Sequence, residues 1–374
     1  MKTPDELSTP SLLMDVTRVR RNAERMSARA VDNGVSLRPH VKTHKCVEVA
    51  RIATEGHSGA VTASTIAEIE AFAAHGFKDF TYAVPIVPAK LPRIIRLLTS
   101  GTKVNLLTDD PDMPAELDKA ARAAGVDFDV FLKVDCGYHR CGVEPGSKEA
   151  VQTVRGISDA AGLNFAGILT HAGHSYHGNS KEEIAEIAGA ERDVMCEFAE
   201  ELRSSGIPVP VISIGSTPTM THVDHLEGID EIRPGNYVFF DAFQATLGSC
   251  GFEDCAITVL ASVVHRSFTN KKAIVDAGSI ALSKDRGPVD IDGGCGYGRV
   301  LDLAGEDTGL RVGSLSQEHG EITVEAPALL DKLKVGTKVR ILANHSCLTA
   351  AQFDHYEVME GDSIVDRWEI HRGW

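Results

Sequence analysis

Residues 36–45, Ser-Leu-Arg-Pro-His-Val-Lys-Thr-His-Lys, open the part of the chain in which the fold is decided. The stretch lies between two segments whose apolar residues have helical spacing, and its own pattern predicts a short strand over Ser36–Thr43. A strand flanked by helices in this way is typical of the first unit of a βα repeat.

Alternation along this strand places Arg38, His40 and Lys42 on one face. An ammonium group is costly to bury without a partner, and a lysine with a desolvated amine is suited to forming a Schiff base. We expect Lys45 to lie in the following helix, so Lys42 is the candidate for a catalytic lysine. The alternative is an ordinary solvated lysine at a strand end.

Strands and helices continue to alternate as far as residue 235, which gives eight predicted strands. Eight βα units in about 200 residues fit a (β/α)8 barrel of the TIM type better than an open doubly wound sheet. The first strand also lacks the Gly-x-Gly-x-x-Gly turn of a dinucleotide-binding fold. We therefore predict a barrel domain over residues 1–249. The other expected strands are Ala60–Ser64, Phe80–Val84, Val104–Thr108, Phe128–Asp135, Phe165–His171, Val209–Gly215 and Glu231–Arg233, and the expected helices are Thr65–His75, Ala89–Leu98, Pro114–Ala124, Lys148–Ala161 and Lys181–Ser204.

The pattern changes after residue 250, where short alternating runs rich in β-branched residues are separated by turn residues. This predicts an antiparallel β domain over residues 250–374. The run Thr9–Val16, which precedes the first barrel unit, is a candidate to pair with that sheet. The expected strands are Ala256–Ser267, Lys272–Asp276, Glu321–Glu325, Lys338–Leu342, Tyr356–Glu360 and Ser363–His371.

Composition excludes several classes of protein. The formal net charge of −15 argues against binding to nucleic acid or to an anionic membrane surface. No apolar run reaches 18 residues, and the first 20 residues lack the pattern of a signal peptide. The eight cysteines are scattered through a long chain rather than spaced as a disulfide framework or a zinc ribbon. These features indicate a cytoplasmic protein.

Polar and glycine-rich segments follow several of the predicted barrel strands, where the active sites of barrels are built. They are Lys42, Asp135–Arg140, His171–Tyr176, Gly215–Thr217 and Gly235–Tyr237. Because the carboxyl ends of parallel strands meet at one end of a barrel, we expect these segments to converge there.

Two of these segments have a recognisable chemistry. Small residues and hydroxyls at Gly215, Ser216 and Thr217 allow backbone N–H groups to approach a phosphate, although a plain turn with a helix N-cap fits equally well. Arg140 could donate to a phenolate oxygen or a carboxylate without losing its charge. The alternative for Arg140 is a salt bridge at the rim.

A possible metal site follows the predicted strand Lys338–Leu342. If strand geometry persists, His345 and Cys347 project from the same face, and imidazole and thiolate can then share a divalent metal. Two protein ligands suit a catalytic metal, which keeps positions open for water and substrate. His319 is a further candidate in the β domain. The histidines after the sixth strand are more typical of pocket walls than of ligands: His171, His174 and His177.

With these residues in place, the chain resembles the fold-type III pyridoxal-phosphate enzymes, and within them the D-threonine aldolase and D-serine dehydratase group. The resemblance covers nearly the whole chain and implies an alanine-racemase-like barrel with a C-terminal β domain. It rests on Thr9–Asp15, Arg38–Lys45, Tyr82–Pro85, Lys133–Gly142, Arg233–Tyr237, Ser316–Gly320 and Asn344–Cys347.

The resemblance also implies roles for individual residues. Lys42 would hold pyridoxal 5'-phosphate as an internal aldimine, Arg140 would support the ring oxygen, and Tyr176 would lie beside the ring or the phosphate. The metal would be bound by His345 and Cys347. The phosphate would be bound by Gly215, Ser216, Thr217, Asn236 and Tyr237. Enzymes of this kind are homodimers in which the β domain of one subunit closes the barrel of the other.

These parts predict a lyase that acts on 3-hydroxy D-amino acids such as D-serine, D-threonine or D-threo-3-hydroxyaspartate. The amine of Lys42 takes the Cα proton, the cofactor ring acts as electron sink, and the metal helps the β-hydroxyl to leave, so that a keto acid and ammonia result. If a base takes the hydroxyl proton instead, the Cα–Cβ bond breaks and the enzyme is an aldolase.

Cys347 favours the dehydratase, because comparable aldolases often have an aspartate as the second ligand. A thiolate also favours zinc over magnesium, with manganese a further alternative. A racemase is a more distant alternative, since it needs a second base on the side where His345 and Cys347 are expected. A non-catalytic pyridoxal-phosphate-binding barrel would lack residues 250–374, and a barrel without any cofactor is the remaining alternative.

Overall fold

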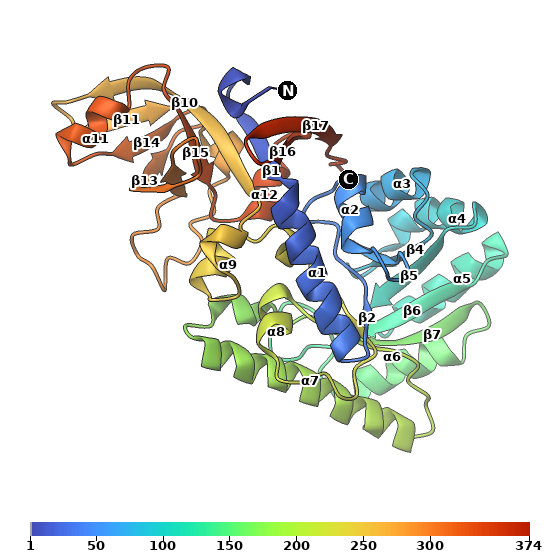
Figure 1. Cartoon of the computed structure of the whole chain (residues 1–374). Coiled ribbons are helices and arrows are strands. Elements are labelled where there is room, and N and C mark those ends of the chain that lie inside the picture. Colours follow the sequence, from blue (N-terminus) through green and yellow to red (C-terminus); the bar gives the residue numbers. More distant parts are fainter. Residues whose placement is uncertain (1) are drawn as a thin grey trace. The chain divides into compact units, whose positions relative to one another are not determined.

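The computed structural model describes residues 2–374, and its contacts divide the chain into two compact units (Figure 1). The barrel unit comprises residues 25–42, 50–235 and 371–374. Of the described residues, the β unit comprises 2–24, 43–49 and 236–370. Within residues 2–374, no helix is long and apolar enough to cross a membrane.

The barrel unit is built on an eight-stranded sheet in which all paired strands are parallel, in the order β2-β9-β8-β7-β6-β5-β4-β3. A parallel bridge between His40 and Thr62 joins the segment after β2 to β3, the strand at the opposite end of this order. The predicted barrel is therefore confirmed. The strands are β2 (Ser36–Leu37), β3 (Val61–Ala63), β4 (Asp79–Tyr82), β5 (Lys103–Thr108), β6 (Phe128–Lys133), β7 (Leu163–Leu169), β8 (Ile212–Ile214) and β9 (Glu231–Ile232).

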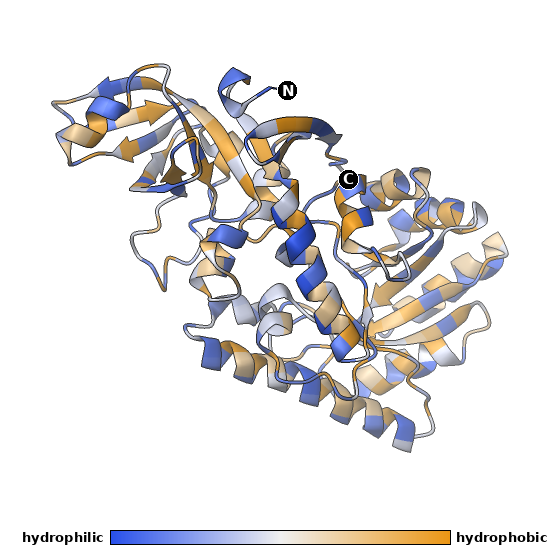
Figure 2. Cartoon of the chain, viewed as in Figure 1, coloured by the Kyte–Doolittle hydropathy of each residue, from blue (hydrophilic) through white to orange (hydrophobic). Residues whose placement is uncertain are grey.

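Helices connect these strands, and capping side chains define where several of them begin. Thr65 accepts from the Glu68 N–H in a capping box, and Ser147 and Ser180 accept from the N–H three residues further on. The longest helix, α7, is amphipathic, and Figure 2 shows polar and apolar turns alternating along it. The helices are α2 (Val47–Ala53), α3 (Ile66–Ala74), α4 (Leu91–Thr99), α5 (Met113–Ala124), α6 (Lys148–Ser158), α7 (Lys181–Ser204) and α8 (Thr217–His222).

The β unit contains a nine-stranded sheet in the order β11-β14-β13-β12-β15-β10-β1-β16-β17. Because β10 also pairs with β11, six of these strands, β10, β11, β14, β13, β12 and β15, close into an antiparallel barrel. The first strand, β1, pairs antiparallel with β10 and parallel with β16. The bounds are β1 (Ser11–Asp15), β10 (Ile257–Ser267), β11 (Lys272–Val275), β12 (Arg299–Leu301), β13 (Asp307–Leu315), β14 (Gly320–Thr323), β15 (Lys338–Leu342), β16 (His355–Glu360) and β17 (Ser363–Glu369).

Short helices complete the β unit. Helix α1 (Val16–Asp32) follows β1 and continues into the first residues of the barrel unit, and α9 (Ala242–Thr246) follows the last barrel strand in the chain. The others are α10 (Ser279–Leu282), α11 (Pro327–Lys332) and α12 (Ser346–Ala350). Leu7, Leu13, Leu260 and Met359 form a buried cluster between β1 and its two neighbours.

The pattern-based expectations missed β12 and β13. Strand β12 has only three residues, which is too short to show alternation. Strand β13 contains Gly309 and Gly313, and Val312 is its one buried residue, so no apolar face is visible in its sequence. Each strand buries a single valine, Val300 or Val312, and is recognised in the structure by its pairing with neighbouring strands.

Candidate active site

The segment around Lys42 differs from the strand that its sequence predicts. Strand β2 ends at Leu37, and Pro39, which has no N–H to donate to a ladder, interrupts it. The backbone then forms a turn over 41–44, and the side chain of Lys42 is exposed rather than buried. Lys45 has a φ of 50° and precedes α2, which begins at Val47. The prediction that Lys45 lies in the following helix is therefore wrong.

A buried lysine does exist in the barrel, at the end of β6. Lys133 is 5% exposed, and burial together with the nearby charge of Arg233 lowers the pKa of Lys133 to about 8. Sequence reasoning assigned no role to Lys133, although it obeys the rule applied to Lys42: it is a lysine that ends a strand buried on both faces.

Arg233 is also buried, directly after β9. Its guanidinium donates to the Ser213 hydroxyl at 2.7 Å and to the carbonyl of Thr170. Burial lowers the pKa of Arg233 to about 10, and the carboxylates of Glu231 and Glu191 oppose that shift. The barrel unit therefore contains two buried cationic side chains, Lys133 and Arg233.

Four cationic side chains act on one histidine of this unit. Burial lowers the pKa of His171 well below its ordinary value, and four nearby positive charges lower it further: Lys42, Lys133, Arg140 and Arg233. A protein with a net charge of −15 therefore concentrates positive charge at the carboxyl ends of its barrel strands. Such a cluster fits an anionic ligand, and a phosphate group meets that requirement.

Aromatic side chains lie beside this cluster. Arg140 is exposed, and its guanidinium lies 4.9 Å from the centre of the Tyr138 ring. The Tyr138 ring stacks on His174 at 6.1 Å and meets His171 edge-on at 6.3 Å. Gly173 is required there, because a Cβ on it would lie 2.2 Å from the Tyr138 ring. His171 and His174 thus contact the Tyr138 ring, and their role as pocket walls stays a prediction.

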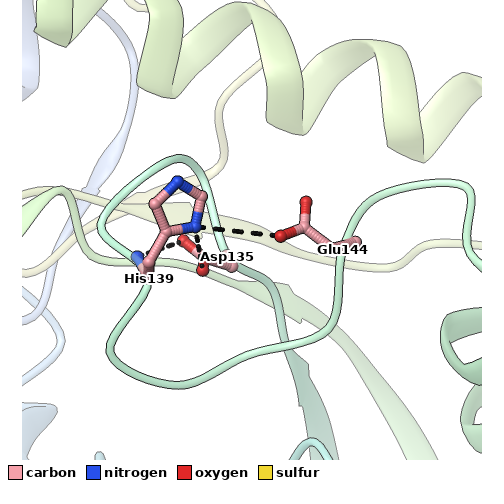
Figure 3. A group of neighbouring side chains, drawn as sticks. All are labelled: Asp135, His139 and Glu144. Atoms are coloured by element: carbon pink, nitrogen blue, oxygen red, sulfur yellow. Dashed lines mark hydrogen bonds and ion pairs between the residues drawn. The ribbon is translucent and has the colours of Figure 1, made fainter.

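Asp135 braces the loop that carries Tyr138 and Arg140 (Figure 3). Its Oδ1 accepts from the N–H groups of Gly137 and His139 at 2.9 and 3.0 Å, and its Oδ2 lies 3.1 Å from Nδ1 of His139. Ligand atoms of Asp135, His139 and Glu144 lie within 4.8 Å of one another. His139 and Glu144 are exposed, and the Asp135 oxygens already serve the turn, so we interpret the group as a loop brace.

The segments after β7 and β8 lie against each other. Tyr176 is half-buried in the short helix Gly173–His177 that follows β7. Gly215 follows β8 with a φ of 113°, a conformation that other residues rarely adopt, and Ser216 caps α8. The hydroxyls of Ser175 and Ser216 lie 3.0 Å apart. Ser216 thus caps a helix, as the alternative of a plain turn predicts, and the phosphate role of Gly215, Ser216 and Thr217 stays a prediction.

Asn236 and Tyr237 belong to the β unit, where both are buried. The Asn236 amide donates to Asp241 at 2.7 Å and to the Ser346 hydroxyl at 3.1 Å, and its Nδ2 lies 3.7 Å from Cys347 Sγ. Burial raises the pKa of the Tyr237 phenol. Within its own unit, Asn236 therefore supports the segment that carries the proposed metal ligands.

His345 and Cys347 are brought together, although not by a strand. Strand β15 ends at Leu342, and His345 is the N-cap residue of α12, in which Cys347 is the second residue. Burial alone would lower the pKa of His345, but the neighbouring Cys347 thiolate and a hydrogen bond to Asp285 raise it well above its ordinary value. The turn into α12, rather than strand alternation, places imidazole and sulfur side by side.

Asp285 was not anticipated from sequence. The Nδ1–H of His345 donates to its Oδ2 at 2.7 Å, which leaves Nε2 as the imidazole nitrogen available to a metal. As a thiol, Cys347 donates to the Thr43 hydroxyl at 3.3 Å, and as a thiolate its Sγ would accept from that hydroxyl instead. An oriented imidazole beside a thiol fits a borderline-soft dication. His319 lies exposed in the turn between β13 and β14.

The chain is similar to known proteins along nearly its whole length. Residues 14–242 match the family model of the alanine racemase N-terminal domain, and residues 256–359 match that of a putative serine dehydratase domain. The D-threo-3-hydroxyaspartate dehydratase of Delftia sp. (strain HT23) is 38% identical over 98% of each chain. A D-serine dehydratase of Dictyostelium discoideum is 36% identical over 99% of this chain and 98% of its own.

A solved structure of the D-threo-3-hydroxyaspartate dehydratase from Delftia sp. HT23 superposes with a TM-score of 0.96 and covers 100% of both chains. A cysteine-to-alanine variant of an enzyme with the same name was solved in a metal-free form, also with a TM-score of 0.96. The D-threonine aldolase of Arthrobacter sp. is 29% identical over 97% of this chain and 92% of its own.

Two family models therefore cover the barrel and most of the β unit, and relatives above 30% identity match the chain from end to end. With the alanine-racemase-like fold described above, these matches show that the chain belongs to the fold-type III pyridoxal-phosphate enzymes of the D-serine dehydratase and D-threonine aldolase family.

Proposed function

We propose that this protein is a pyridoxal-phosphate- and divalent-metal-dependent dehydratase that converts 3-hydroxy D-amino acids to keto acids and ammonia. The observation that carries the proposal is the pairing of His345 with Cys347, with Asp285 orienting the imidazole from behind. Cysteine beside histidine is the donor set that favours the dehydratase over the aldolase.

The cofactor would be held chiefly by the barrel unit. Lys42 is the attachment point, Arg140 and Tyr176 are the proposed neighbours of the ring, and Lys133 and Arg233 add positive charge for the phosphate. Bound pyridoxal phosphate supplies an electron sink for the electron pair left when a Cα proton is removed. The remaining proposed phosphate ligands are Gly215, Ser216, Thr217, Asn236 and Tyr237.

The segment that follows Lys42 in the chain contacts a proposed metal ligand within the β unit. Cys347 donates to the hydroxyl of Thr43, and Thr43 directly follows Lys42 in the chain. The exposed amine of Lys42 is the group that would take the Cα proton. A dication on His345 and Cys347 would supply Lewis acidity to a substrate hydroxyl, and the thiolate favours zinc, with manganese and magnesium as alternatives.

D-threo-3-hydroxyaspartate and D-serine are the proposed substrates, because similar proteins carry names for those activities. Retro-aldol cleavage to glycine and an aldehyde is the second candidate, since a D-threonine aldolase is related over most of its length. We propose a homodimer as the working form, as the family resemblance implies.

Product analysis tests the function. Protein loaded with pyridoxal phosphate and zinc is incubated separately with D-serine, D-threonine and D-threo-3-hydroxyaspartate, and the Lys42→Ala variant serves as the background. We expect keto acid and ammonia in equal amounts. Glycine with an aldehyde would instead establish an aldolase.

The metal requirement is tested on the same protein. Exhaustive chelation should abolish keto-acid formation, and addition of zinc, manganese or magnesium in turn should show which ion restores it. Full activity after chelation would refute the role assigned to His345 and Cys347.

A further inference from the structure

We propose that Glu191, on the outer helix α7, is a positioning residue that holds the loop after β8, which is assigned to the cofactor phosphate, against the loop after β7, which carries Tyr176. The proposal rests on the function proposed above, and it adds a residue that no motif indicated. Glu191 is 0% exposed, although it lies in a helix whose other glutamates are mostly at the surface.

One oxygen of Glu191 joins the ends of two neighbouring strands. Oε1 accepts from the N–H of Ala172, which follows β7, at 2.9 Å, and from the N–H of Gly215, which follows β8, at 3.2 Å. Strands β7 and β8 pair with each other. The Glu191 carboxylate connects the two loops that follow these strands, where the hydrogen bonds between the strands have ended. The Ser175–Ser216 hydroxyl contact at 3.0 Å joins the same two loops.

The bond to Gly215 holds a peptide in a conformation that glycine adopts readily and other residues do not. Gly215 has a φ of 113°, and a Cβ there would lie 3.0 Å from Met220. Because glycine is conformationally permissive, the peptide needs an external partner to stay in one orientation. Glu191 provides that partner, and the next residues, Ser216 and Thr217, are proposed phosphate ligands.

Burial of the carboxylate is costly, which indicates a specific role. An ionised carboxylate loses much free energy on leaving water unless hydrogen bonds replace the water. Oε1 has its two N–H donors, whereas Oε2 is buried and has no hydrogen-bond partner within residues 2–374. Both hydrogen bonds of the side chain therefore go to the two loops. We infer that Glu191 acts because its side chain is long enough to bring Oε1 to both N–H groups.

Two substitutions at Glu191 distinguish the effect of side-chain length from the effect of charge. Glu191→Gln keeps the side-chain length and one carbonyl oxygen but removes the charge, whereas Glu191→Asp keeps the charge and shortens the reach by one methylene. Glu200→Asp makes the same change at an exposed position of the same helix and is the matched control. Binding of pyridoxal phosphate and of unphosphorylated pyridoxal to each full-length protein is measured by equilibrium dialysis, with circular dichroism as the check on folding.

We expect Glu191→Asp to weaken pyridoxal phosphate binding by about tenfold or more, the equivalent of one or two lost hydrogen bonds. Its affinity for pyridoxal should stay within about twofold of the wild type, because only the phosphate contacts change. Glu191→Gln should retain pyridoxal phosphate affinity within about threefold, and Glu200→Asp should match the wild type.

Other results overturn the proposal in distinguishable ways. If Glu191→Asp binds pyridoxal phosphate as the wild type does, or binds pyridoxal phosphate and pyridoxal with equally reduced affinity, Glu191 does not position the loops after β7 and β8 for the phosphate. A Gln variant weaker than the Asp variant would show that charge, not reach, is what matters. If the wild type binds neither ligand, the function proposed for the whole protein fails as well.

Discussion

At the scale of single residues, the two lysines at strand ends have opposite environments. Lys42 is exposed in a turn, where an aldehyde can reach its amine, whereas Lys133 is enclosed at the end of β6. The residue type and its place at a strand end were visible in the sequence. Which of the two is buried depends on Pro39, which ends β2 early, and on the neighbours that surround β6.

We expect Lys42→Ala to abolish covalent fixation of pyridoxal phosphate by borohydride and to lower turnover by at least about a hundredfold, because both the attachment point and the base are lost. Lys45→Ala should keep both properties. Mass spectrometry of the reduced, digested protein identifies the modified lysine. Label on Lys45, or on Lys133, would contradict the assignment.

The pKa of Lys133 predicts a stability that depends on pH. Burial lowers the folded-state pKa of Lys133 to about 8 from the usual 10.5. Between these values the unfolded chain binds more protons than the folded chain, so the free energy of unfolding should rise with pH across this window, by up to about 3 kcal/mol. Below pH 8 both states are protonated and the penalty is constant.

This rise is measured as a difference between two proteins, because thiols also titrate in the window. Urea unfolding of the cofactor-free wild type and of Lys133→Met is followed from pH 7 to 10.5. The stability of the wild type relative to Lys133→Met should increase with pH. A difference that does not change would show that Lys133 titrates normally.

At the scale of elements, the proposed metal ligands depend on a loop from elsewhere in the β unit. The segment 283–298, between α10 and β12, carries Asp285 to His345. The Asn344 amide ties the loop down by donating to the carbonyls of Asp285 and Gly296 at 3.3 and 2.9 Å. A Cβ on Gly287 would lie 2.8 Å from Asn344, so loop and helix start are closely packed.

We expect Asp285→Ala to weaken binding of zinc or manganese by about 10- to 100-fold, because the imidazole loses the partner that fixes its tautomer and orientation. Pyridoxal phosphate binding should remain. Metal titration by calorimetry measures the change, and Asp290→Ala, at an exposed position in the same loop, is the control. Equal affinities for Asp285→Ala and wild type would show that the carboxylate does not support the metal site.

At the scale of the whole molecule, the chain is predicted to work as a homodimer. The family resemblance implies that the β domain of one subunit closes the barrel of the other. Cys347 nevertheless bonds to Thr43 of its own chain, and Thr43 follows Lys42, so we expect Lys42, His345 and Cys347 of one active site to come from the same subunit even if other β-domain residues come from the partner. The subunit arrangement can therefore be tested by mixing two inactive variants.

Sedimentation velocity should give twice the monomer mass. Lys42→Ala and Cys347→Ala proteins, unfolded and refolded together, should recover no activity, because no mixed dimer then contains an intact site. Recovery to about a quarter of the wild-type activity would show that the two residues of one site come from different subunits. Mixed refolding of two wild-type samples controls for refolding yield.

The order of the βα units, the β strands after residue 250 and the family could all be predicted from the amino-acid sequence alone. Strand alternation, helix caps and turn residues act over a few neighbours, so β15 and α7 have the bounds that their patterns predict. The candidate residues Lys42, His345 and Cys347 were also found there, because their residue types and motifs identify the chemistry.

The residues that support these candidates could be recognised only in the folded chain. Asp285 is far from His345 in the chain, and Glu191 lies in the middle of an ordinary amphipathic helix, so neither forms a pattern with the group it contacts. The exposure of Lys42 and the burial of Lys133 likewise depend on neighbours brought together by folding. Hydrogen bonds and burial between distant segments leave no periodic signal, and they place the side chains on which the proposed chemistry depends.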